Sequence, residues 1–314
     1  MSGLDALLHR PEQESFWSRL RRSPAKVLAE YIYTSRAVSQ SPASNSIPIQ
    51  VVCISDTHNT KPNLPDGDIL IHAGDLTQSG SRLELEEQIE WLNAQPHRYK
   101  VVIAGNHELC LDSQLQSSRT GTSSGGDAPD TDSAAIDWKS LVYLENTSTV
   151  LNLGNGRNIK VFGSPCTPKH GNWAFQYPRS NAAIWDEISI PDDTDILITH
   201  GPPKAHLDLG HFGCLLLRRT LWGMKQRPLL HVFGHIHGGY GKEVVLWDSF
   251  QRAYETVMDG ESRGVGLMSL VYSWMMGWLT GWGTKNEQAT VMVNAAAVGG
   301  VRDEKRRDAV CVDI

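Results

Sequence analysis

The sequence predicts an α/β fold, in which buried strands alternate with surface helices. Short runs of Val, Ile and Leu, typical of strands buried on both faces, occupy residues 51–54, 69–71, 101–104, 196–198 and 229–233. Between them lie segments in which apolar residues recur at helical spacing. Each run ends in a polar block that contains Asp, Asn or His. Because ligands of α/β folds bind at the carboxyl edge of the sheet, we expect these blocks to form one site.

The composition is that of a soluble globular protein with a hydrophobic core. The chain has 314 residues, of which 40% are hydrophobic and 20% are charged, enough for one large domain or two small ones. Its formal net charge of -6 argues against general nucleic-acid binding, which usually requires a basic surface.

The cysteines predict a reducing environment. They are odd in number and scattered, at Cys53, Cys110, Cys166, Cys214 and Cys311. No two have C-x-x-C spacing, so the sequence predicts neither a disulfide framework nor a zinc knuckle. The N-terminus also lacks the apolar core and cleavage site of a secretory signal. We therefore expect an intracellular, cytoplasmic protein, with membrane association left open by residues 1–48 and 264–284.

Three regions are expected along the chain: an N-terminal helical extension and linker at 1–48, a folded domain at 49–300, and a C-terminal tail at 301–314. In the extension, apolar residues recur near helical spacing from Leu4 to Val38, interleaved with basic residues. This helix either packs on the domain or binds a membrane surface or a partner. Polar residues 39–46 predict the linker.

The remaining elements follow from periodicity and turn signals. Residues 82–93 predict a surface helix, and 142–153 and 158–162 predict two strands joined by a turn at Asn155-Gly156. Residues 243–247 and 290–293 predict the closing strands. Residues 113–133, rich in Ser, Gly, Thr and Asp, predict a disordered insertion.

Residues 264–284 predict an apolar, Trp-rich insertion without a charged residue. About 20 apolar residues can span a bilayer. A single crossing would, however, place the strands on either side of this segment on opposite sides of the membrane. The remaining interpretations are a helix in the membrane interface, a dimer contact, a lid over the site, or a plain buried helix.

The polar blocks carry the chemistry. They are Asp56-Thr57-His58, Gly74-Asp75, Gly105-Asn106-His107-Glu108, Thr199-His200-Gly201 and Gly234-His235-Ile236-His237. Imidazoles and carboxylates that meet at one edge suit two divalent metal ions. In the last block, alternation along an extended segment places both histidines on one side and Ile236 on the other. Five of the histidines outside the blocks are expected to be structural: His72, His97, His206, His211 and His231.

In this order and spacing, the blocks resemble those of the calcineurin-like metallophosphoesterase superfamily. The match runs from about residue 51 to 297. The sequence segments that contain the blocks resemble those of the branch called metallophosphoesterase-domain-containing proteins. Examples are Ile71-His72-Ala73-Gly74-Asp75 and Thr199-His200-Gly201-Pro202-Pro203. This resemblance implies a two-sheet β-sandwich flanked by helices.

The resemblance also implies a set of metal ligands. Asp56, His58 and His237 would hold a first divalent ion, Asn106, His200 and His235 a second, and Asp75 would bridge the two. Mn, Fe and Zn all accept such mixed nitrogen and oxygen ligands. A metal-bridging hydroxide would attack phosphorus, and His107 would serve as the general acid for the leaving oxygen. Glu108 would orient the loop around His107.

The expected substrate is a small phosphoester, a phosphodiester rather than a monoester. Protein phosphatases of the superfamily carry G-D-x-V-D-R-G, whereas here Gly74-Asp75 continues as Leu76-Thr77-Gln78. Trp173 and Phe175 are candidates for stacking on the substrate and Arg179 for a phosphate, although core packing explains the aromatics equally well. The alternatives are a phosphomonoesterase, or a binding module that uses the same fold at a membrane or partner surface, with contact or dimerisation through 264–284.

Overall fold

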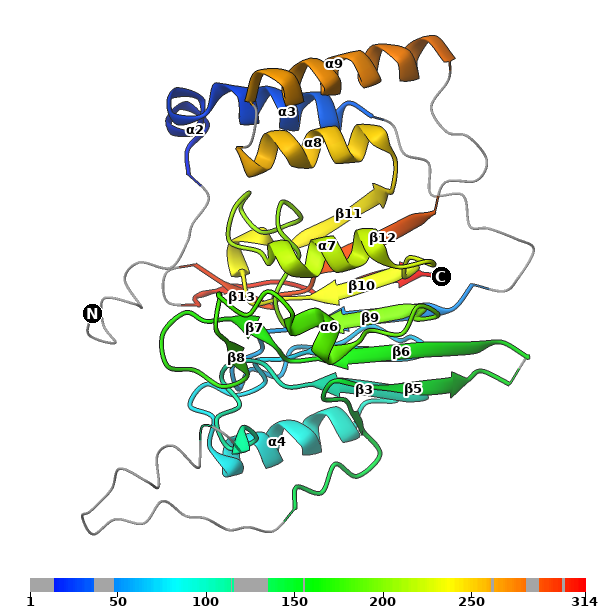
Figure 1. The fold of residues 1–314 in the computed structure, drawn as a ribbon. Coiled ribbons are helices and arrows are strands. Elements are labelled where there is room, and N and C mark those ends of the chain that lie inside the picture. The colour runs from blue at the N-terminus through cyan, green and yellow to red at the C-terminus, as the bar shows by residue number, and fades with distance from the viewer. Residues whose placement is uncertain are drawn as a thin grey trace.

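The computed structural model describes residues 14–36, 48–113, 115, 135–154, 156–260, 263–280, 288–300 and 303–314. Two β-sheets lie face to face, α4 (Arg82–Asn93) covers one outer face, and α6 (Ile184–Ile188) and α7 (Leu215–Gly223) cover the other (Figure 1). This arrangement is the predicted two-sheet sandwich flanked by helices.

The first sheet has five strands in the order β15-β1-β2-β3-β4. Its strands are β1 (Gln50–Ile54), β2 (Ile69–Ala73), β3 (Tyr99–Ile103), β4 (Val142–Tyr143) and β15 (Val310–Asp313). Strands β1 to β4 are parallel, and β15 pairs antiparallel with β1. Strand β15, which lies in the segment expected as a tail, therefore completes a sheet. The expectation was wrong for β15 because its pairing with β1 is long-range and leaves no local signal in the sequence.

The second sheet has six strands in the order β11-β12-β10-β9-β6-β5. Its strands are β5 (Thr147–Asn152), β6 (Asn158–Ser164), β9 (Ile196–Thr199), β10 (Leu230–Phe233), β11 (Gly241–Leu246) and β12 (Ala289–Asn294). The four central strands are parallel, and the two edge strands are antiparallel. The predicted turn between β5 and β6 includes Asn155, which lies outside the described residues.

Short elements surround the sheets. They are β7 (Thr167–Pro168), β8 (Gln176–Tyr177), β13 (Val298–Gly299), β14 (Lys305–Arg306) and the 3-10 helix η1 (His237–Gly239). Strands β7 and β8 pair with each other, as do β13 and β14.

The central strands read as continuous apolar runs because both of their faces are covered. On β1, Val51 and Cys53 pack between the two sheets, whereas Val52 and Ile54 pack toward α4. The same rule holds on β9, where Ile196 and Ile198 face the other sheet. Burial on both faces leaves no polar face, as expected of parallel strands.

The predicted helix at 82–93 is confirmed as α4. Its N-cap Ser81 accepts a hydrogen bond from the backbone N–H of Glu84, and Leu85, Ile89 and Leu92 are buried at helical spacing. This burial holds α4 against the outer face of the first sheet.

A helical layer lies beyond the β11 edge of the second sheet (Figure 1). It consists of α3 (Pro24–Thr34), α8 (Ser249–Asp259) and α9 (Arg263–Thr280), with α2 (Phe16–Arg22) beside α3. Ala29 and Ile32 of α3 pack with Leu270 of α9 in one apolar cluster. Within its described residues 14–36, the predicted extension forms two helices that are separated at Ser23, before Pro24. Proline favours the first helical position and disfavours a helical conformation in the residue before it.

Several predicted segments lie wholly or partly outside the described residues. The segment 1–13 and the linker 39–46 lie outside the described residues, as do almost all of 113–133 and residues 281–284. The predicted insertion at 264–284 is helical as α9 up to Thr280. Among the described helices, none is long and apolar enough to cross a membrane.

Candidate metal centre

Five strands deliver the predicted site residues to one place. The polar blocks follow β1, β2, β3, β9 and β10, and parallel strands bring their carboxyl ends to the same edge. Ligand atoms lie within 4.8 Å of one another in three overlapping groups: Asp56, His58 and His237; His58, Asp75 and His107; Asp75, His200 and His235. His58 and Asp75 each belong to two of the groups.

In the first group the ligand atoms face each other. His237 Nε2 lies 3.1 Å from Asp56 Oδ1 and 3.5 Å from His58 Nε2. The Nδ1 atoms of both histidines point away from the centre and have hydrogen-bond partners of their own. His58 Nδ1 lies 3.1 Å from the carbonyl of Thr77, and His237 Nδ1 lies 3.1 Å from Asp303 Oδ1. A ring that donates its Nδ1–H outward leaves the Nε2 lone pair toward the centre, as metal-binding histidines do.

The second group repeats this arrangement. His200 Nε2 lies 3.0 Å from Asn106 Oδ1 and 3.3 Å from Asp75 Oδ2, while its Nδ1 lies 2.9 Å from the carbonyl of Ala73. The ring of His235 lies 4.9 Å from that of His200. All seven predicted ligands thus converge on the same edge of the sheets.

The backbone is strained where it presents these side chains. Asp56, His58, Asp75 and His235 have positive φ angles of 50°, 43°, 54° and 64°. Such conformations are costly for residues other than glycine and concentrate at functional sites. Gly234 is required for a further reason, since a Cβ there would lie 1.9 Å from Asp56 Oδ2.

The electrostatics favour a cation at the centre. Burial alone would raise the pKa of Asp56, but the adjacent His237 lowers it below its ordinary value, so the carboxylate is ionised. Burial lowers the pKa of His58 to about 4 and that of His235 to about 3, so both rings are neutral. Burial also opposes a charge on His200, yet Asp75 raises its pKa to about 9. Ionised carboxylates and neutral imidazoles are the forms that bind metals, and the raised pKa of His200 shows that Asp75 favours positive charge at this position. The donor set therefore fits a pair of divalent ions.

His107 adjoins the ligands in a fixed orientation. Its backbone N–H donates to Asp75 Oδ1 at 2.8 Å, and its Nδ1 lies 2.8 Å from the carbonyl of Gln78. Its ring stacks on Trp173 with centroids 4.5 Å apart and meets the ring of His58 edge-on at 4.6 Å. With Nδ1–H donated to a carbonyl, Nε2 remains for proton exchange.

Glu108 ties together the loops that carry the ligands. Its carboxylate is buried and accepts hydrogen bonds from the backbone N–H groups of Asp75, Gly105 and Thr77 and from the Thr77 hydroxyl, at 2.6–3.0 Å. Burial, and then the nearby Asp75, raises its pKa. These contacts fit the expectation that Glu108 orients the loop around His107.

The three predicted substrate residues separate in the structure. Trp173 lies at the site, 38% exposed, against His107. Phe175 is anchored through its backbone, with its N–H donating to Asp112 Oδ2 at 2.7 Å. Arg179 is exposed and its Nε donates to the carbonyl of Lys169 at 3.1 Å. Among the contacts of these three residues that the structure gives, only that of Trp173 reaches a predicted site residue.

Sequence reasoning missed the residues that support the site from the C-terminal segment. Asp303 lies against His237, and Arg307 donates to the carbonyls of His237 and Val298. No motif marks either residue, and both lie in the region expected to be a tail. Only the pairing of β13 with β14 brings them to the centre.

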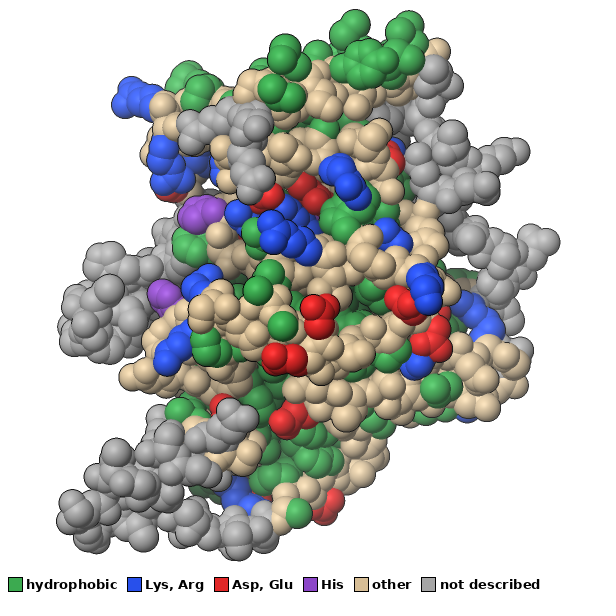
Figure 2. All heavy atoms as spheres, in the orientation of Figure 1, with side chains coloured by type: hydrophobic (Ala, Val, Ile, Leu, Met, Phe, Trp, Pro, Cys, Tyr) green, Lys and Arg blue, Asp and Glu red, His purple; other side chains and the backbone are tan. Residues whose placement is uncertain are grey.

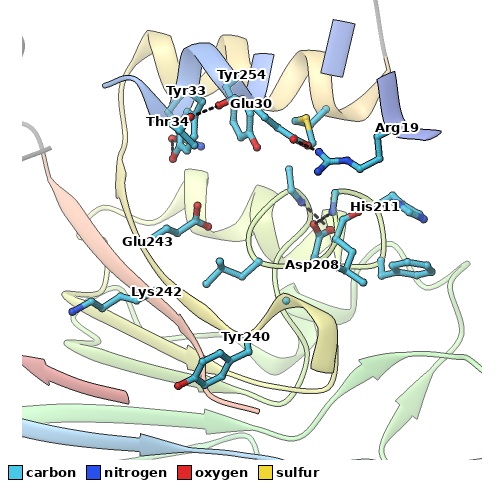
Figure 3. Close-up of a pocket in the computed structure, with 18 of the residues that line it drawn as sticks. Arg19, Glu30, Tyr33, Thr34, Asp208, His211, Tyr240, Lys242, Glu243 and Tyr254 are labelled. Atoms are coloured by element: carbon cyan, nitrogen blue, oxygen red, sulfur yellow. Dashed lines mark hydrogen bonds and ion pairs between the residues drawn. The ribbon is translucent and has the colours of Figure 1, made fainter. Parts of the chain in front are cut away.

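A separate cavity of about 920 Å³ lies between α2, α3, α8, β11 and the loop 205–212 (Figure 3). None of the eight predicted metal and catalytic residues lines it. Beside it is a buried ion network in which His206 contacts Glu243 at 2.8 Å and Glu255 at 3.1 Å. These contacts lie away from the metal centre and connect His206 to β11 and α8.

Comparisons with known proteins identify the family of the chain. The calcineurin-like phosphoesterase family matches residues 49–239, and the chain belongs to this family. Within it, the chain is 38% identical over 204 residues to metallophosphoesterase domain-containing protein 1 of Homo sapiens, covering 60% of this chain and 61% of that protein. It is 34% identical over 243 residues to the UPF0046 protein K07C11.7 of Caenorhabditis elegans, covering 74% of this chain and 78% of that protein.

Another relative is much longer than the chain. A protein of Emericella nidulans named probable rhamnogalacturonate lyase C is 61% identical over 311 residues, which are 99% of this chain but only 29% of that protein. Among solved structures, TT1561 of Thermus thermophilus matches with 13% identity and a TM-score of 0.37, over 63% of this chain and 85% of that one.

Proposed function

We propose that the protein hydrolyses phosphoesters with two bound divalent ions, and that it prefers phosphodiesters. The observation that carries the proposal is the convergence of the ligand atoms of Asp56, His58, Asp75, His200, His235 and His237 beside His107. A binding module with a degraded site would be expected to lack some of these ligands, and all seven predicted positions carry suitable residues.

The residues divide the chemistry among them. Two bound dications would supply charge stabilisation for the phosphate and lower the pKa of water. Asp75 would contact both ions, and the buried carboxylates would offset part of their charge. His107, whose Nδ1 is held by the Gln78 carbonyl, would donate a proton from Nε2 to the leaving oxygen. Trp173, stacked on His107, would keep the ring in place and exclude water from one face.

We do not propose lyase activity for this chain, although its Emericella nidulans relative is named a probable lyase. The match covers 29% of that protein, and the chain within the match contains the phosphoesterase family region. The remainder of that protein lies outside the match. Polysaccharide elimination therefore has no support from the residues of this site.

Hydrolysis of bis-(p-nitrophenyl) phosphate and p-nitrophenyl phosphate, with Mn²⁺, Fe²⁺ or Zn²⁺ added, tests the proposal. We expect turnover of both, with the higher kcat/KM for the diester. Asp75→Asn should abolish hydrolysis of both esters. The control Asp193→Asn, which changes a surface partner of Lys160, should leave hydrolysis unchanged. Protein shown by metal analysis to be loaded, yet inactive on both esters, would refute the hydrolase. A higher kcat/KM for the monoester would refute the diester preference alone.

A further inference from the structure

Helix α9 is apolar on two opposite faces. Its inner face packs Leu270, Val271 and Trp274 against α3 and α8. Its outer face exposes large apolar side chains at helical spacing: Val265, Met268, Tyr272, Met275 and Leu279. Trp278, which continues the row of Val271 and Trp274 beyond the packed part of the helix, is also exposed. Leu279 is 77% exposed and Trp278 70% exposed. Contiguous exposed apolar surface of this kind marks an interaction site.

The neighbouring helices extend this surface and add positive charge. Phe16 and Trp17 of α2 and Tyr31 of α3 are also exposed. On α2 and α3, the basic residues Arg19, Arg21, Arg22 and Lys26 outnumber the acidic residue Glu30 and the neighbouring Glu14, which pair with Arg19 and Arg22, respectively. Arg36 does not contribute to this surface, because it is buried against Asp248. The whole chain, by contrast, has a net charge of -6. Figure 2 shows the hydrophobic side chains gathered over α9 along one end of the molecule, with Lys and Arg side chains over α2 beside them.

We propose that the outer face of α9, together with α2 and α3, docks on the interface of a membrane that carries anionic headgroups. Trp and Tyr side chains are favoured at the bilayer interface, and apolar side chains gain by entering the acyl boundary. Arginines and lysines next to that face attract anionic headgroups, and residues 264–280 contribute no acidic residue to oppose them. The contact is peripheral, because the inner face of α9 stays packed on α3 and α8 while the outer face meets the lipid.

The charge distribution favours a lipid surface over a second copy of the chain. In a twofold contact through α9, each copy would bring its own basic α2–α3 segment to the same interface. Like charges at an interface are unfavourable, whereas an anionic surface complements them. The predicted metal ligands follow β1, β2, β3, β9 and β10, so changes on the outer face of α9 leave them intact.

Co-sedimentation of the full chain with vesicles tests this inference. We expect it to pellet with mixed phosphatidylcholine and phosphatidylserine vesicles, less with phosphatidylcholine alone, and less as NaCl increases. The double variant Met268→Gln, Leu279→Gln should bind about tenfold more weakly or worse, since burying one leucine is worth at least that factor. The matched control Leu83→Gln, Val150→Gln removes exposed apolar side chains from α4 and β5 and should bind like the wild type.

Three outcomes would overturn the inference: no pelleting of the wild type with either vesicle, equal pelleting of the wild type and the α9 variant, or an equal loss of binding in both double variants. Analytical ultracentrifugation tests the alternative, in which a second copy of the chain covers the outer face of α9. A wild-type dimer that the α9 variant converts to a monomer would assign this face to self-association instead of lipid. Unchanged hydrolysis of a soluble ester by the α9 variant shows that it is folded.

Discussion

Replacing Glu108 by glutamine tests whether this buried carboxylate holds the metal-bearing loops together. One carboxylate oxygen accepts hydrogen bonds from the N–H groups of Asp75 and Gly105, and the other accepts from the N–H and hydroxyl of Thr77. Glutamine keeps one oxygen and turns the other into an amide N–H₂. The amide costs less when its N–H₂ group faces Thr77, because the Thr77 hydroxyl can rotate and accept a hydrogen bond from it. The backbone N–H of Thr77 then has no acceptor.

The expected loss of stability follows from the hydrogen bonds that Glu108→Gln would remove. One buried donor without a partner costs about 1–3 kcal/mol, and the remaining bonds lose their charge assistance. We therefore expect Glu108→Gln to lower the free energy of unfolding by roughly 2–4 kcal/mol. Urea unfolding followed by circular dichroism, in the presence of a chelator, measures this change without a contribution from metal binding.

Glu84 provides the matched control. Its half-buried carboxylate accepts hydrogen bonds from Asn59 Nδ2 and from the N–H and hydroxyl of Ser79, each at 2.8 Å. Water can replace these contacts, so Glu84→Gln should cost about 1 kcal/mol or less. Equal losses for the two variants would refute the reasoning, and would indicate that Glu108 carries a proton in the folded protein.

Four other outcomes are expected. His107→Gln should lower kcat by about 10²–10⁴ with metal content unchanged, and an undiminished kcat would exclude the general-acid role. Trp173→Ala should lower kcat by roughly twofold to tenfold, with recovery in Trp173→Phe, because ring stacking is worth about that much. Burial opposes a charge on His206, but Glu243 and Glu255 raise its pKa to about 10. The stabilisation that charged His206 contributes should be complete below pH 6.5 and be lost as the pH rises toward 10. In urea titrations, the difference in unfolding free energy between wild type and His206→Gln should therefore vanish at high pH. Mn²⁺ at about a hundred times its Kd should stabilise the fold by about 2.7 kcal/mol over chelated protein, and an unchanged Tm would argue against binding.

Much of the site could be predicted from the sequence because it is built from local signals. Each ligand directly follows a buried strand, so the apolar run and the polar block together indicate both the strand and its functional end. The helix 82–93 could be predicted for a similar reason, since its cap and apolar spacing lie within its own residues.

The supports of the site could not be predicted in this way. Asp303 and Arg307 reach His237 only through strand pairing in the C-terminal segment, and β15 joins the first sheet beside β1, more than two hundred residues away in sequence. The sequence predicts Trp173 as a residue that stacks on the substrate, but not that its ring also stacks on His107. This second contact depends on the fold of the loop that carries Trp173.

The sequence by itself determined the α/β class, the site-forming strands and the residue types at their ends, because burial and strand ends are encoded locally. The tertiary structure alone decided which nitrogens of His58, His200 and His237 face the centre, which loops Glu108 joins, and which face of α9 stays exposed. These features depend on contacts between segments far apart in the chain. No local pattern of residues records such contacts.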